Sequence, residues 1–467
     1  MNISQGLLPF QLIEDASKVV LTSFGGLPLV METFRALSLP QSIQRHLPLL
    51  RREGKYREAD YIESFVAVFA AGGDCVDDFE MLRRDEGLMK LGLRVPSPEA
   101  ARWVLNAFHE EELLQGRLPH QAFIPEETEL LEGLHFVQRD LIWKATLEEQ
   151  PWKATLDLDA LVIESQKREA YWTYLGEKGY QPVIVYWAEQ DLILVDEFRD
   201  GNVPAQADLL QVLKKAISAL PLTVRLVRVR SDSAAYVHEF LNWCRKEVPG
   251  RPRIEFAISA DMTEELRAAI QALPEEAWKP LRKVTDKGLI VGRKEWAEVE
   301  FVPSQPSRKK WMKPDRYLAI RIQPLQGELF GDGNAYHYFA VVTNMWSWDG
   351  ERLLQWQRER CGTVEKVHDV MKNDLAGGVL PAKRFFANAA WWRLNALTYN
   401  VLSVMKRKAL PPSWWPLRLK ALRFHLLNIA ARVIEHARKL FLKIARLHPS
   451  FLLYKEAREK LLIFSSA

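Results

Sequence analysis

The stretch ATLDLDALVIES, residues 154–165, decides the fold, because it sets two acids into an apolar run with the period of a β-strand. Successive side chains of a strand point to opposite faces. Leu156 and Leu158 therefore share one face, while Asp157 and Asp159 share the other. A strand that carries acids on one face is a candidate for chemistry as well as for packing.

Strand and helix patterns alternate downstream of this stretch. Residues 182–201 predict two strands joined by a polar turn, residues 222–246 a strand followed by a helix, and residues 253–270 the same plan again. This order is typical of an α/β fold with one central mixed sheet. We place the first part of that core at residues 150–275.

The pattern then changes twice. Residues 276–348 are rich in strand signals, such as KEWAEVEFVP and AYHYFAVVTNMW, and we interpret them as a β-rich insertion that interrupts the core. Residues 349–405 return to helical patterns and are expected to complete the core. Residues 406–467 are expected to form a basic helical C-terminal region.

Residues 1–145 predict helices, and we expect this region to bind DNA. The clearest start signal is Ser97 as an N-cap with Pro98 at the first helical position. Short helices with polar turns fit a helix-turn-helix DNA reader, and they also fit a plain helical bundle that acts as a scaffold.

Composition describes a globular protein that acts on a polyanion. The 467 residues suggest about two to four domains, and 48% of them are hydrophobic while 27% are charged. From Lys406 to the end there are 14 Lys and Arg against 3 Glu, a net charge of +11, which suggests a polyanionic partner, although a solvated helical surface fits this charge as well. Three isolated cysteines favour a reducing compartment. No apolar run is long enough to span a membrane, so we expect a cytoplasmic, nucleoid-associated protein.

Three acids lie where catalysis is common. Asp159 lies in the first strand, and Asp232 follows the strand LTVRLVRVR, at the end of a strand where open α/β sheets place functional groups. Glu365 lies in RCGTVEKVHDVMKND, residues 360–374, which predicts an amphipathic helix. Lys372 follows Glu365 by seven residues, about 20° around a regular helix. Taken alone, Asp232 could equally cap the next helix.

The order of these acids resembles that of the RNase H-like polynucleotidyl transferases, and in particular the DDE transposases of bacterial insertion sequences. The resemblance runs from about residue 155 to residue 402, through TLDLDALVIES, VRVRSDSAAY, RERCGTVEKVHDVMKNDL and RFFANAAWWRLNALTYNVL. It points to the branch with a β-strand insertion and a Tyr–Arg–Glu–Lys signature. It implies an RNase H-like mixed sheet with helical N- and C-terminal regions.

The signature is kept only in part. Glu365 and Lys372 have the family spacing, whereas Arg360 stands one residue too early and the aromatic position falls on Trp356. For the first acid, Asp159 matches the family motif better than Asp157, which is the fallback.

By resemblance, Asp159, Asp232 and Glu365 would ligate two Mg²⁺ (or Mn²⁺) ions. Hard oxygen ligands fit these ions, and three carboxylates can hold a pair while leaving positions for water and phosphate. Lys372 and Arg360 would contact DNA phosphates. The activity implied is cleavage at the ends of a mobile element and joining of the 3′-hydroxyls to target DNA, by a homodimer in a synaptic complex with double-stranded DNA.

Basic and aromatic side chains suggest further DNA contacts. SRKKWMKPDR, residues 307–316, groups basic residues around an indole that could stack on a base, although a solvated hairpin loop fits as well. Trp346 and Trp348 could hold a flipped base or pack in a core. His368 fits a surface position better than a role beside Glu365. The DNA contacts expected from the first segment are Arg308, Lys309, Lys310 and Trp311.

Two other functions fit the sequence. One is a transposase-derived protein that binds DNA without cutting it, and the other is a metal-dependent endonuclease without strand transfer. Phosphate-binding glycine motifs are absent from the sequence, so use of ATP or NAD is not expected.

Overall fold

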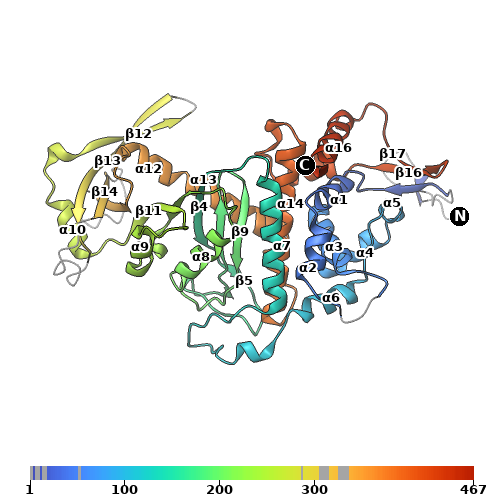
Figure 1. Ribbon diagram of the computed structural model, residues 1–467, viewed down its shortest axis with the longest axis horizontal. Helices are drawn as coiled ribbons and strands as arrows, with labels where there is room; N and C mark the ends of the chain where they lie inside the picture. The colour runs from blue at the N-terminus through green and yellow to red at the C-terminus, as the bar shows by residue number, and fades with distance from the viewer. Residues whose placement is uncertain are drawn as a thin grey trace.

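The computed structural model describes residues 4–5, 11–12, 18–50, 54–285, 288–303, 315–323 and 336–466. Along its longest axis the molecule has a β-rich end, a central α/β portion and a helical end (Figure 1). Within the described residues, no helix combines the length and the apolar character that a membrane crossing requires.

A nine-stranded sheet in the order β12-β13-β14-β15-β11-β10-β4-β8-β9 forms the centre. Strand β10 pairs in parallel with β4 and β11, whereas β8 pairs antiparallel with β4 and β9, so the predicted mixed sheet is confirmed. All of β8 is buried, as an apolar run covered on both faces should be. The core strands are β4 (Lys153–Ala160), β8 (Val183–Trp187), β9 (Leu192–Glu197), β10 (Leu226–Ser231) and β11 (Arg253–Ala260).

The β-rich segment lies in the sequence between the core strands and the later helices, as expected of an insertion, and its strands extend the same sheet. Strand β15 pairs antiparallel with β11, and β14, β13 and β12 follow in turn. The free edge of β11 supplies unpaired backbone groups, which a strand placed beside it satisfies. The added strands are β12 (Lys279–Thr285), β13 (Gly288–Phe301), β14 (Asp315–Ile322) and β15 (His337–Thr343).

Helices cover the sheet, and the longest of them is almost entirely buried. Helix α14 packs against β9, where the Asn400 amide accepts from the N–H of Ile193 and donates to its C=O, both at 2.8 Å. Asn400 of this apolar helix thus provides hydrogen-bond partners for backbone groups at the open edge of the sheet. The helices are α8 (Leu209–Ala219), α9 (His238–Arg245), α10 (Glu264–Gln271), α12 (Gly350–Arg358), α13 (Arg360–Asp369) and α14 (Phe385–Ala409).

Helices α1, α3 and α6 pack on α14, and α7 contacts both α14 and the edge strand β9. Helix α6 starts as predicted, with the Ser97 hydroxyl accepting from the N–H of Ala100. Helix α3 is buried, and Phe65 and Phe69 meet the Trp391 ring edge-on, so α3 is a scaffold helix. The helices are α1 (Leu27–Ala36), α2 (Leu39–His46), α3 (Glu58–Ala71), α4 (Phe79–Arg83), α5 (Glu86–Lys90), α6 (Pro98–Ala107) and α7 (Glu129–Thr146).

The C-terminal region is not helical throughout, which corrects the expectation for residues 406–467. Between two helices it forms the hairpin β16–β17, and β16 pairs antiparallel with β3 near the N-terminus. The strands ARVIEH and KLFLKI are rich in apolar, aromatic and β-branched residues, which favour strands. The elements are β3 (Val20–Thr22), α15 (Leu419–Leu422), β16 (Ala431–His436), β17 (Lys439–Ile444) and α16 (Phe451–Ser466).

Short strands complete the described secondary structure. Three of them form a small separate sheet in the order β5-β7-β6, and two pair near the N-terminus. They are β1 (Ser4–Gln5), β2 (Gln11–Leu12), β5 (Ile163–Glu164), β6 (Tyr171–Trp172) and β7 (Lys178–Tyr180).

Candidate active site

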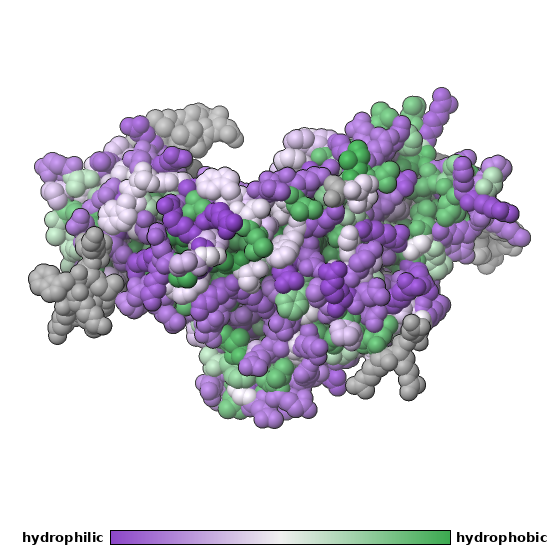
Figure 2. Space-filling view, viewed as in Figure 1, coloured by the Kyte–Doolittle hydropathy of each residue, from purple (hydrophilic) through white to green (hydrophobic). Residues whose placement is uncertain are grey.

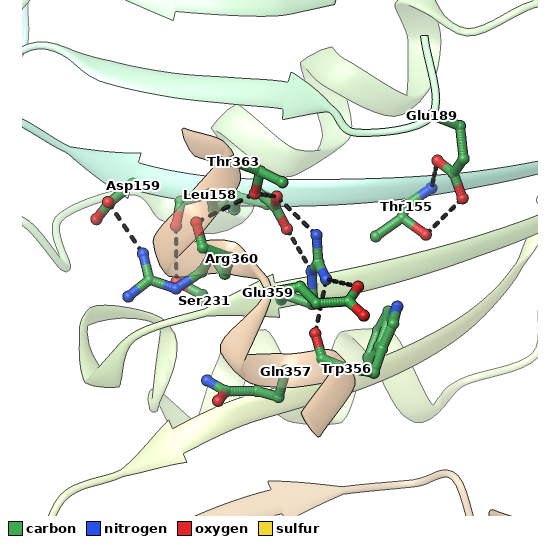
Figure 3. A network of polar contacts seen from close by, with 12 residues as sticks. Thr155, Leu158, Asp159, Glu189, Ser231, Trp356, Gln357, Glu359, Arg360 and Thr363 are labelled. Atoms are coloured by element: carbon green, nitrogen blue, oxygen red, sulfur yellow. Dashed lines mark hydrogen bonds and ion pairs between the residues drawn. The ribbon is translucent and has the colours of Figure 1, made fainter. Parts of the chain in front are cut away.

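Asp157 is fully buried, and both of its carboxylate oxygens are used in hydrogen bonds that stabilise the fold. Its two oxygens accept from Arg230, Oδ1 from Nε at 2.6 Å and Oδ2 from Nη2 at 2.9 Å, and Oδ2 also accepts from the Thr363 hydroxyl. Thr363, which Figure 3 labels, belongs to α13, so the Asp157 carboxylate joins β4, β10 and α13. A carboxylate used in this way is unsuited to bind a metal ion.

Arg230 extends the same network towards α12. Its Nη1 donates to the carbonyl of Trp356 at 2.6 Å and to Glu359 at 3.2 Å, and its guanidinium lies 5.0 Å from the Trp356 ring centre. Trp356, expected at the aromatic position of the signature, therefore packs on a buried cation. These contacts of Arg230 with Trp356 and Glu359, which precede α13, hold the start of α13 at a fixed position on the sheet.

Asp159, two residues further along β4, faces a different environment. Its side chain is 13% exposed, and Oδ2 lies 2.9 Å from Nη1 of Arg360. Burial raises its pKa to about 6; the Arg360 charge opposes the rise, and the negative charges of Asp232 and Glu365 add to it. Both of the other predicted acids therefore contribute to the raised pKa of Asp159.

Asp232 fills both of the roles weighed for it. Its Oδ1 accepts from the N–H of Ala234 at 3.1 Å and caps the turn Ser233–Ala235. Its Oδ2 has no hydrogen-bond partner within the described parts of the chain. One oxygen therefore fixes the side chain at the end of β10, and the other is available for a ligand.

Glu365 lies on the exposed side of α13, near the exposed Cys361; desolvation and, after it, the charge of Glu365 raise the pKa of the Cys361 thiol. One turn on, His368 is mostly buried rather than a surface residue, with Nδ1 3.9 Å from Oδ2 of Asp159. Burial, with the Arg360 charge, lowers its pKa to about 4, so the ring is neutral at pH 7. The position of His368, one helical turn after Glu365, is the feature of the sequence that could have indicated a place beside the acids.

The three acids fit a hard divalent cation in kind, although their oxygens are not closely gathered. Asp74, Cys75 and Asp78 make up the single His, Cys, Asp or Glu group among described residues with ligand atoms within 4.8 Å of one another. In that group Asp78 accepts from two backbone N–H groups, which is local capping. Burial of Asp159 and, after it, the negative charges of Asp232 and Glu365 raise the pKa of this carboxyl, and a bound cation would relieve the repulsion among the three acids.

Arg360 and Lys372 differ from the arrangement expected for phosphate contacts. Arg360 is buried against Asp159 instead of projecting outwards. Beyond α13 the chain makes the π-helical turn Val370–Asp374, which holds more residues per turn, so Lys372 leaves the regular-helix line drawn from Glu365. Lys372 is exposed, and its Nζ lies 3.3 Å from the carbonyl of Val162, just beyond β4.

The two tryptophans after β15 have different surroundings. Trp346 is 58% exposed. Trp348 packs between Arg228 and Arg352, 4.8 and 4.4 Å from its ring centre. Trp346 is therefore the one free to stack on a base, and Trp348 has a packing role. The remaining predicted DNA contacts, Arg308, Lys309, Lys310 and Trp311, lie outside the described residues.

Comparison with known families decides the identity of the chain. Residues 17–465 match the family model described as "Transposase DDE domain group 1". The chain belongs to this family of transposases. It is therefore a DDE-type DNA transposase, from a family that generally uses divalent metal ions.

Two further comparisons complete this result. No curated protein matches the transposase. Among solved structures, a chain of "Cryo-EM structure of piggyBac transposase synaptic complex with hairpin DNA (SNHP)" is similar, with a TM-score of 0.47 and 9% sequence identity; the match covers 96% of this chain and 83% of that one.

Proposed function

We propose that this transposase cleaves DNA at the ends of a mobile element and joins the freed 3′-hydroxyls to target DNA. Asp159, Asp232 and Glu365 are its catalytic carboxylates and would hold two Mg²⁺ or Mn²⁺ ions. One observation carries this proposal: the charges of Asp232 and Glu365 both act on the buried Asp159 carboxyl and help to raise its pKa. When bound, such ions stabilise the attacking and departing oxygens of an in-line displacement.

The surrounding residues hold this site in place. Arg230, Thr363 and Asp157 fix α13 against the sheet, so that Glu365 is held on the side of Asp159. Arg360 supplies positive charge to Asp159. Because a guanidinium can also bind phosphate with paired donors, Arg360 can exchange the carboxylate for the DNA backbone when cations bind.

DNA would lie across the side of the sheet that carries these acids. Lys372 beside the end of β4 would contact a phosphate, and the exposed Trp346 would stack on a base removed from the helix. Joining two ends requires two copies of the site, so the active form is a homodimer on the paired ends, acting at the nucleoid.

Cleavage assays separate this function from its rivals. Purified protein is incubated with Mg²⁺ and either supercoiled plasmid or linear DNA carrying the element's terminal repeats. The proposal expects nicking at the repeats and joined products from wild type, and neither from Glu365→Gln. Cleavage without joining would indicate an endonuclease. End binding without cleavage by either protein would indicate a DNA-binding derivative.

A further inference from the structure

The hairpin β16–β17 carries an excess of unpaired positive charge. Between Ala431 and Arg446 there is one acidic residue, Glu435. No basic side chain of this stretch has an ion-pair partner in the part of the chain that the structure describes. All of the basic side chains are exposed: Arg432, Arg438, Lys439, Lys443 and Arg446.

The register places three of these cations, Arg432, Lys439 and Lys443, on one face. Arg432 lies opposite Lys443, Ile434 opposite Phe441, and His436 opposite Lys439. Directly opposed residues project to the same side of a sheet, so this face has a cationic pair at its base, an apolar pair in the middle and a cationic tip. The other face is buried only at the base of the hairpin, where Val433 is 2% exposed, whereas Leu440 near the tip is 47% exposed.

Two features of this hairpin lower the stability of its fold. Like charges directly opposite one another, as at Arg432 and Lys443, are destabilising. The two-residue turn places Ala437 and Arg438 at φ values of 49° and 61°, a left-handed conformation for which Asn-Gly is preferred. A polyanion bound against this face would offset both the backbone strain at Arg438 and the repulsion between Arg432 and Lys443.

We propose that this hairpin is a DNA-binding arm that grips the phosphates of double-stranded DNA without reading sequence. The opposed pairs at Arg432 and His436 are four residues apart, about 13 Å along the strand. A major groove about 12 Å wide admits a two-stranded ribbon, so one arm can contact phosphates on both of its sides. Phe441, 42% exposed between the pairs, would lie against sugars and base edges.

The arm lies far from the catalytic helix. Figure 1 shows β16 and β17 at the helical end of the molecule, with α14 and the N-terminal helices between them and α13. On the face shown in Figure 2, this end mixes hydrophobic and hydrophilic residues, as a surface for both sugars and phosphates requires. The contact therefore falls on DNA away from the bond that is cut, and it adds affinity without taking part in chemistry.

The first test removes the opposed pair. Binding of a labelled mixed-sequence duplex, roughly four helical turns long, is measured by anisotropy at increasing salt for Arg432→Gln/Lys443→Gln. Losing two phosphate contacts should lower the slope of log K against log salt by about 1.8 and weaken binding about 30-fold near 0.15 M salt. Lys455→Gln/Lys460→Gln, with the same charge loss on exposed α16 positions, should change the slope far less. Equal slopes for both variants would overturn the proposal.

The second test separates binding from folding. Ala437→Asn/Arg438→Gly installs the preferred turn, so thermal stability should rise while duplex affinity falls about 5-fold near 0.15 M salt. Ala437→Asn alone keeps Arg438 and should keep the affinity. Unchanged affinity in the double variant would refute the arm. Stabilisation of these variants by Mn²⁺ reports on the catalytic acids independently, so loss of duplex binding with an intact Mn²⁺ response would implicate the arm alone.

Discussion

Replacing Asp159 by Asn should stabilise the metal-free protein at alkaline pH. The folded pKa of Asp159 is about 6, above the ordinary value of about 3.9. For a raised pKa, the favourable contribution is complete below about pH 4 and is lost as pH rises through about 6. At pH 8 the ionised group therefore costs about 3 kcal/mol, since each pKa unit corresponds to about 1.4 kcal/mol.

Asn cannot ionise and so avoids this cost. In denaturant titrations with a chelator present, Asp159→Asn should exceed the wild-type free energy of unfolding by up to about 3 kcal/mol at pH 8, and match it near pH 4. Mn²⁺ should stabilise wild type and reduce the difference, because bound cations favour the ionised carboxylates. A variant less stable than wild type at pH 8 would refute the electrostatic reasoning.

Asp157→Asn is the matched control on the same strand. It removes the buried counter-ion of Arg230 and leaves only the exposed Glu359 beside that charge; breaking a buried ion pair typically costs about 3–5 kcal/mol. The loss should appear at pH 8 whether or not Mn²⁺ is present. Stabilisation of this variant at pH 8 would reverse the roles assigned to the two acids.

Three other substitutions test the surroundings of the site. Thr363→Val removes the hydrogen bond to Asp157 and should lower the free energy of unfolding by about 1–3 kcal/mol, measured by urea titration; no change would mean that this bond does not hold α13. Asn400→Leu leaves the N–H of Ile193 without its Asn400 acceptor, while the Gln138 amide still donates to the C=O of Ile193, and should cost about 1–3 kcal/mol in the same assay; no loss would contradict the bracing role of α14. Trp346→Ala should leave the melting temperature unchanged and reduce joined product at least several-fold; full joining activity would exclude base stacking there.

The central fold follows from local patterns, because apolar strands alternating with helices leave few ways to build a sheet. ATLDLDALVIES predicted β4, and its alternation placed both acids on one face. Alternation could not tell which acid is free, since that depends on Arg230, 73 residues away in sequence, reaching Asp157 rather than Asp159.

Other differences have similar physical causes. The pairing of β15 with β11 joins residues 80 to 86 positions apart in the sequence, so no local pattern predicts it. The hairpin β16–β17 lacks a glycine or asparagine turn, so its strongest sequence mark is missing. The π-helical turn before Leu375 shifts Lys372 off the regular-helix line, a change that residue spacing alone does not encode.

The central claim is that Asp159, Asp232 and Glu365 together hold the divalent ions that this transposase uses. The most direct measurement is the number of Mn²⁺ ions bound per chain, from the loss of the free-ion electron paramagnetic resonance signal, with duplex DNA present. We predict two ions for wild type and for any folded Asp157→Asn protein, and fewer for Asp159→Asn, Asp232→Asn and Glu365→Gln. Unchanged Mn²⁺ binding in all three of those variants would contradict the account.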